Sequence, residues 1–79
     1  MRNVVSVGFG NFVNKERIVA IVAPNSTPIR KLKEQLKDDG KIIDVTQGRK
    51  TRSIIIMDSG HIILSGIAVD TIAERVNDE

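Results

Sequence analysis

Two apolar runs, at 54–57 and 62–64, place hydrophobic residues at consecutive positions with no polar residue inside either run. Successive side chains of a β-strand point to opposite faces, so strands made of these runs are apolar on both faces. The residues between them, Asp58-Ser59-Gly60, are typical of a tight turn, which predicts that the two runs pair as a hairpin. Each face of that hairpin then requires its own covering layer.

The rest of the chain predicts an α+β fold in a single domain over 1–79. Short runs rich in β-branched residues indicate further strands at 4–7, 12–13, 18–23 and 42–45. The expected architecture is a small, mostly antiparallel β-sheet with one main helix and a short C-terminal helix.

Both helices carry recognisable end signals. Thr27 is a suitable N-cap with proline directly after it, and Gly40 is a natural stop for the main helix. The C-terminal helix is expected to be capped by Asp70 or Thr71 and to run through Val76.

Two helices of this size can cover one face of the sheet, which leaves the second face in need of a partner. A second subunit would supply that cover, and this favours a homo-oligomer. The alternative is a monomer whose N-terminal strands wrap over the second face. A chain of 79 residues without cysteine has no disulfide to compensate for a small core, which also favours oligomerisation.

Composition excludes several classes of protein. The chain lacks a stretch of about 20 apolar residues, as a membrane span requires, and it shows no signal peptide, so we expect a cytoplasmic protein without membrane contact. The absence of cysteine removes thiolate metal sites. The net charge of +2 is too small for a monomer to hold DNA by bulk charge, so the position of the charges must matter.

A basic turn precedes the first apolar run. Arg49, Lys50 and Arg52 lie in a stretch with no acidic residue between Asp44 and Asp58. Cationic side chains on a turn before a firmly held strand suit the phosphates of a nucleic acid, while the alternative is a solvated loop that only maintains solubility. Neither phenylalanine is near Arg49 in the sequence, so duplex phosphates are favoured over stacked single strands.

No catalytic or cofactor site is expected. Gly8-Phe9-Gly10 resembles the start of a dinucleotide-binding loop, but Val13 replaces its third glycine. His61 lies near Ser59 and Asp58, yet no nucleophile elbow accompanies them. We therefore expect neither an enzyme nor a bound small-molecule substrate.

The chain resembles the RemA family of bacterial extracellular matrix regulatory proteins over nearly its whole length. The segments that carry the resemblance are VGFGN, RIVAIV, STPIRK, IDVTQGRKTR, IIMDS and HIILS, in chain order. The resemblance implies a transcriptional regulator with a fold like that of LytTR-type DNA-binding domains, assembled into a ring-shaped homo-oligomer that binds duplex DNA through repeated contacts. It also implies biofilm-matrix target genes and a location at the nucleoid.

Carried over residue by residue, the resemblance assigns DNA contacts to Arg17 and Arg49. Lys50 stands where many members have a second arginine, and Arg52 also matches a family position. Lysine keeps the charge but loses the bidentate geometry of arginine. Gln47 stands where members usually carry tyrosine.

Three functional hypotheses follow. The first is an oligomeric DNA-binding regulator with Arg17, Arg49, Lys50 and Arg52 as its contacts. The second is a structural or scaffolding ring subunit whose basic turn meets a protein partner. The third is a small anion-binding or RNA-binding module, which would prefer single strands over duplex.

Overall fold

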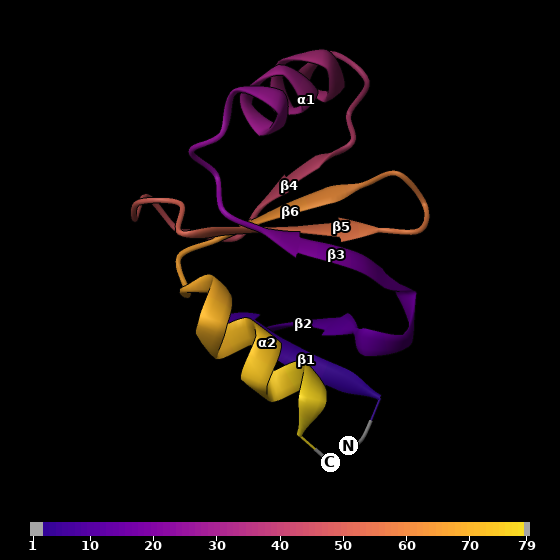
Figure 1. The fold of residues 1–79 in the computed structure, drawn as a ribbon, viewed down its shortest axis with the longest axis vertical. Helices are drawn as coiled ribbons and strands as arrows, with labels where there is room; N and C mark the ends of the chain where they lie inside the picture. The colour runs from indigo at the N-terminus through magenta and orange to yellow at the C-terminus, as the bar shows by residue number, and fades with distance from the viewer. Residues whose placement is uncertain (1–2, 79) are drawn as a thin grey trace.

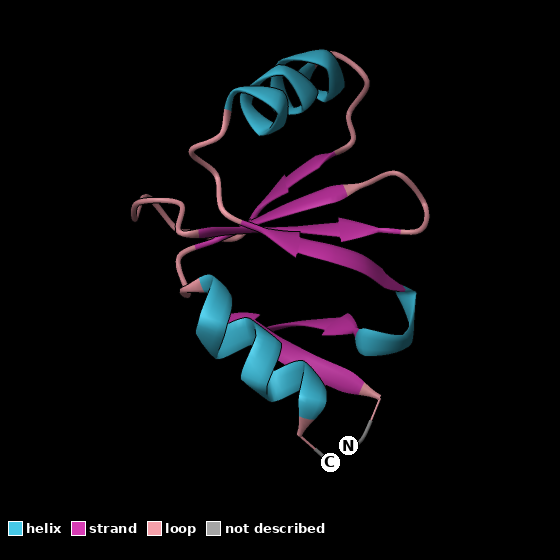
Figure 2. Cartoon of the chain, in the orientation of Figure 1, coloured by secondary structure: helices cyan, strands magenta, loops and turns pink. Residues whose placement is uncertain are grey.

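The computed structural model describes residues 3–78 as an α+β structure in three layers (Figures 1 and 2). A four-stranded sheet forms the middle layer, with one helix on one face and a two-stranded hairpin and the second helix on the other. The elements, in chain order, are β1 (Val4–Gly8), β2 (Asn11–Asn14), a 3₁₀ turn (Lys15–Arg17), β3 (Ile18–Val22), α1 (Thr27–Lys37), β4 (Ile42–Asp44), β5 (Ser53–Met57), β6 (Ile62–Ser65) and α2 (Val69–Asn77).

The four-stranded sheet has the order β3-β5-β6-β4. The predicted hairpin is confirmed as β5 and β6, which pair antiparallel with Ile54 opposite Leu64 and Ile56 opposite Ile62. Strand β3 also runs antiparallel to β5, whereas β4 is parallel to β6. The expectation of one mostly antiparallel sheet needs one correction, because β1 and β2 form a separate antiparallel sheet of their own.

The two faces of the β5–β6 hairpin enter two different cores, as the unbroken apolar runs predict. Ile54, Ile62 and Leu64 pack against α1. Ile55 and Ile63 face the other way. There they form a core with residues from β1, β2 and α2, namely Val5, Val7, Val13 and Ile72.

The second face of the β5–β6 hairpin is covered within the chain itself, so the expectation that this face needs a partner subunit as cover is wrong. The N-terminal hairpin and α2 of the same chain cover it, as in the alternative of N-terminal strands that wrap over the sheet. The physical reason is that β1 alternates, so that Val5 and Val7 point inward while Val4 and Ser6 are only half-buried. An uncovered β5–β6 face is therefore no reason for this chain to form an oligomer.

Helix α1 begins one residue earlier than its sequence signal indicates. Ser26, not Thr27, is the N-cap, and its hydroxyl accepts a hydrogen bond from the backbone N–H of Ile29 at 3.4 Å. Ser26 has the extended backbone that a cap requires, so Thr27 becomes the first helical residue. At the other end Gly40 has φ +68°, and the N–H of Lys41 donates to the Leu36 carbonyl at 3.4 Å, so the expected stop is confirmed.

Helix α2 also starts before its predicted caps. It begins at Val69 after Ala68, which offers no side-chain cap, so the assignment of Asp70 or Thr71 as the cap is wrong. Both residues lie in the first turn instead, where the negative charge of Asp70 suits the positive end of the helix dipole. The first backbone hydrogen bond sets this start, because the N–H of Ile72, which is fully buried, donates to the Ala68 carbonyl at 3.1 Å.

Candidate nucleic-acid interface

The basic turn between β4 and β5 has a well-anchored backbone. The Asp44 carboxylate accepts hydrogen bonds from the backbone N–H and the hydroxyl of Thr46, at 2.8 and 2.7 Å. The side-chain bond from Thr46 and then its backbone bond hold the pKa of Asp44 below the ordinary value, with the charge of Lys33 acting in the same direction. At the far end, the N–H of Arg52 donates to the Ser65 carbonyl at 2.8 Å.

Two residues of this turn have left-handed backbones. Gln47 has φ +51° and Gly48 has φ +83°. A left-handed residue other than glycine is uncommon, and long side chains adopt that conformation only where the surrounding structure requires it. The turn thus presents Arg49 and Lys50 from a fixed backbone, and both side chains are exposed.

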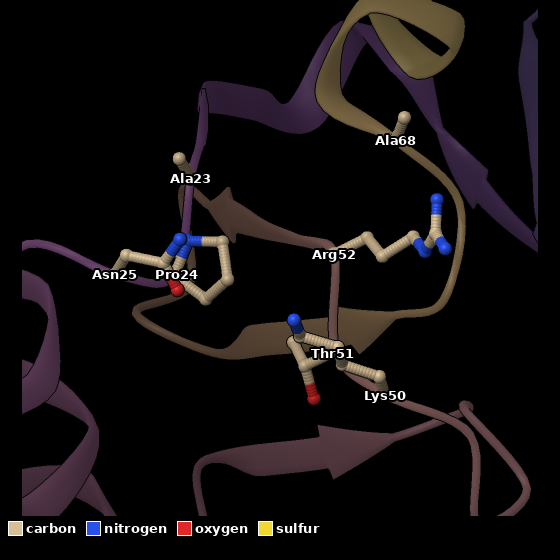
Figure 3. Close-up of a pocket in the computed structure, with 7 residues that line it drawn as sticks. All are labelled: Ala23, Pro24, Asn25, Lys50, Thr51, Arg52 and Ala68. Atoms are coloured by element: carbon tan, nitrogen blue, oxygen red, sulfur yellow. The ribbon is translucent and has the colours of Figure 1, made fainter.

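Lys50 and Arg52 share one hollow, of about 380 Å³. Figure 3 shows the Arg52 side chain extending toward the segment that carries Ala68, the residue before α2. The other walls are Ala23, Pro24 and Asn25 from the β3–α1 connection, and Thr51. Two cations, a polar amide and the uncapped start of α2 therefore surround a space that is suited to an anion.

Arg49 lies over a different surface. Its Cζ atom is 5.6 Å from the centroid of the Phe9 ring, within the range of a cation–π contact. The two residues line a second hollow of about 290 Å³, together with Val7, Gly8, Gly66 and Ile67.

The sequence-based inference that no phenylalanine is near Arg49 is therefore wrong in three dimensions. The fold brings the β1–β2 turn beside the basic turn, although the two are far apart in the chain. Phe9 is the residue that sequence reasoning missed. The only signal for it was a large apolar side chain between Gly8 and Gly10, which predicts an exposed position on a turn.

Arg17 lies at the opposite end of the sheet from the basic turn. Its Nη1 atom is 3.1 Å from Oδ2 of Asp58, the residue that follows β5, whereas Arg52 precedes β5. A strand of five residues spans about 17 Å, so Arg17 is separated from the basic turn by at least that length. Figure 1 shows the two turns on opposite sides of the molecule, with the β4–β5 turn at the left and the β5–β6 turn at the right. Within one subunit the structure does not bring the four predicted contacts together.

The Ser59, His61 and Asp58 group does not form a relay. Ser59 Oγ is 2.7 Å from His61 Nδ1, but the Asp58 carboxylate is paired with Arg17 rather than with the histidine ring. Within residues 3–78, no three His, Asp or Glu side chains are grouped so that they could hold a metal ion. Neither helix in that range is long and apolar enough to cross a membrane.

Comparison with known proteins identifies close relatives along nearly the whole chain. The sequence model of the RemA-like family, described as extracellular matrix regulatory protein A-like, matches residues 4–76. A protein of Nitratidesulfovibrio vulgaris strain DP4 is 57% identical over 75 residues, which are 95% of this chain and 87% of that protein. A Thermosipho melanesiensis protein is 56% identical over 75 residues, 95% of this chain and 80% of its own length. Both relatives carry only a provisional name, as regulatory proteins.

Proposed function

Because this chain belongs to the RemA-like family, we propose that it is a transcriptional regulator that binds duplex DNA through basic side chains repeated around a homo-oligomeric ring, with matrix-type genes as its targets. The observation that carries the proposal is the exposed cationic group of Arg49, Lys50 and Arg52 on an anchored turn. Because the backbone of the turn is already fixed, only the side chains have to be ordered when they bind phosphates, and the entropy cost of ordering the loop is avoided.

The hollow between Lys50 and Arg52 suits a backbone phosphate. Both side chains donate hydrogen bonds to anions. The first N–H groups of α2 lie beside Ala68, with the negative charge of Asp70 in the same turn. These contacts carry no sequence information, so we expect them to set affinity and position on the duplex rather than base preference.

Repetition would make such a small cluster useful. If each subunit neutralises two or three phosphates, the salt slope of a single subunit is only about −2 to −3, and one subunit would bind weakly. A ring that presents the same turn many times gains affinity through effective concentration. The family resemblance implies the ring, and repeated binding is what the ring would add.

The decisive experiment compares the wild type with Arg49→Ala and Lys37→Ala in titrations of duplex DNA at several salt concentrations. The two variants lose the same charge, but Lys37 lies at the far end of α1 from the basic turn. Arg49→Ala should weaken binding by at least about fivefold and reduce the salt slope by about one. Lys37→Ala should stay close to the wild type, and native mass should be the same for all three. Equal binding by Arg49→Ala at physiological salt would contradict the proposal.

A scaffolding subunit with a protein partner is the second candidate, because carboxylates lie at the end of the molecule opposite the basic turn. The C-terminal end of α1, followed by Asp38 and Asp39, lies on the same side as the β5–β6 turn with Asp58. Lys37 and Arg17 lie at the same end, so this end is mixed in charge, and its carboxylates could meet the basic turn of a neighbouring subunit. On this hypothesis Arg49→Glu lowers the native mass of the assembly itself, whereas a DNA-binding role predicts an intact assembly that no longer binds DNA.

A further inference from the structure

The β1–β2 turn has an unusual backbone. Gly8, Phe9 and Gly10 have φ values of +106°, +54° and +76°. Glycine adopts such angles freely, but for a bulky aromatic residue a left-handed backbone is a genuine outlier. The Asn11 side-chain amide stabilises the turn, donating to the carbonyls of Gly8 and Phe9 at 3.0 and 3.3 Å. Phe9 is thus held at one defined position.

That position keeps the Phe9 ring outside both cores. Phe9 is 49% exposed and belongs to neither apolar cluster of the described residues. A large apolar side chain on a strained turn, left half in water, does little for folding by area burial. The exposed half of the ring is therefore available to a ligand beside Arg49.

Phe9 and Arg49 are positioned by the same short segment. A side chain at Gly8 would meet Cδ1 of Ile67 at 3.3 Å, so the β1–β2 turn lies directly on that residue. A side chain at Gly66 would meet the Lys50 carbonyl at 3.6 Å and Cβ of Arg49 at 3.8 Å, so the basic turn lies on the adjoining residue. Two turns from distant parts of the chain are thus held side by side, one with an aromatic ring and the other with cations.

We propose that Phe9 is a nucleic-acid contact residue, which packs its ring against the deoxyribose rings of the duplex next to the phosphates bound by the basic turn. This rests on the proposed function, because the cations of the neighbouring basic turn, Arg49, Lys50 and Arg52, are what select a polyanion as the occupant. The deoxyribose is the same at every position of a duplex, so the contact tolerates different sequences. The contact adds a contribution to the binding free energy that salt does not screen.

The test is a titration of labelled duplex DNA with the full-length chain at several salt concentrations. The variants are Phe9→Ala, Phe9→Gly, Arg49→Ala and the double variant Phe9→Ala with Arg49→Ala. Phe12→Ala is the matched control, because Phe12 is similarly exposed at 57% but lies on β2 and does not line the hollow that Phe9 shares with Arg49. Phe9→Gly suits the left-handed backbone, so agreement between the two Phe9 variants excludes misfolding as the cause.

Both Phe9 variants should bind at least about fivefold more weakly than the wild type, with an unchanged salt slope, because the exposed half of the ring is no longer buried against DNA. Phe12→Ala should bind like the wild type. Arg49→Ala should reduce the slope. The double variant should bind more weakly than either single variant but by less than the sum of the two effects, because Phe9 and Arg49 are in contact.

Two results would overturn the inference while leaving the proposed function intact. One is wild-type affinity in both Phe9 variants. The other is a reduced salt slope in Phe9→Ala with no further loss in the double variant, which would mean that Phe9 only orients Arg49. If the wild-type protein itself fails to bind duplex DNA, or binds single strands better, the proposed function falls and the inference falls with it.

Discussion

Ser53 and Ser65 lie directly opposite each other in the β5–β6 ladder and both are fully buried, but only Ser65 has hydrogen-bond partners for its hydroxyl. Ser65 Oγ donates to the Val7 carbonyl at 2.8 Å and accepts from the N–H of Ile67 at 3.0 Å. Within residues 3–78, the hydroxyl of Ser53 has no partner. One serine therefore joins the sheet to β1 and to the segment before α2, and the other does not.

This difference predicts opposite effects of the same substitution. Ser65→Ala should lower the free energy of unfolding by about 1–3 kcal/mol, because the buried carbonyl of Val7 and the partly buried N–H of Ile67 lose their partner. Ser53→Ala removes a buried hydroxyl that has no partner, so the free energy of unfolding should be unchanged or higher. Chemical denaturation of both variants measures the difference, and an equal loss in the two would contradict the hydrogen-bond assignment.

The start of α1 offers a second matched pair of substitutions. Ser26→Ala should lower the free energy of unfolding by about 0.5–1 kcal/mol, because the N–H of Ile29 loses its capping acceptor. Thr27→Ala should have little effect or a slightly stabilising one, since Thr27 is already helical and alanine is the better helix former. Thermal melts followed by circular dichroism report both. A larger loss of stability in Thr27→Ala than in Ser26→Ala would mean that Thr27 is the N-cap.

Asp44 should contribute to the acid sensitivity of the fold. Its pKa in the folded chain is lowered from 3.8 by the hydroxyl and then the backbone N–H of Thr46. A lowered pKa means that the folded state favours the carboxylate. Its contribution to the free energy of unfolding is therefore complete above the pKa of the unfolded chain and is lost as the pH falls through the pKa of the folded chain. The difference in free energy of unfolding between the wild type and Asp44→Asn should therefore decrease as the pH is lowered from about 5 to 3.

Urea denaturation across that pH range measures the effect. Thr46→Val keeps the shape of the side chain but removes the hydroxyl donor, so it should show part of the same change. A constant gap between the wild type and Asp44→Asn at every pH would mean that the Asp44–Thr46 bonds do not favour the charged form.

The Arg17–Asp58 pair predicts a gain of DNA affinity on substitution. Asp58 holds Arg17 at 3.1 Å and adds a negative charge beside it, and the two side chains are 67% and 47% exposed. Asp58→Asn should raise DNA affinity by about two- to fivefold, the size expected for an exposed ion pair. The effect should shrink at high salt because such charges are screened.

Asp39→Asn is the control for Asp58→Asn, since it changes the net charge equally but lies beyond the end of α1. The same gain of DNA affinity in both variants would mean that the effect comes from the net charge alone. A loss of affinity in Asp58→Asn would mean that Asp58 orients Arg17 for binding.

Local patterns predicted the elements well. The two-faced apolar runs, the turn at 58–60 and the stop at Gly40 depend on neighbouring residues, and the structure agrees with each of them. The predicted helix starts were one to three residues too late, because Ser26 and Thr27 are both good caps and because α2 starts after Ala68, which has no side-chain cap, rather than after Asp70 or Thr71. For the candidate site, the sequence identified an exposed basic turn but not its neighbours.

By itself, the sequence determined that β5 and β6 are apolar on both faces and that Arg49, Lys50 and Arg52 extend from a turn, because strand period and turn chemistry act over a few residues. Only the tertiary structure decided that the chain's own hairpin and α2 cover the second face, that Arg17 lies at the opposite end of β5, and that Phe9 meets Arg49. These three outcomes depend on which distant segments pack together. That choice is made by the burial of whole faces and by the entropy of closing long loops, which no short pattern records.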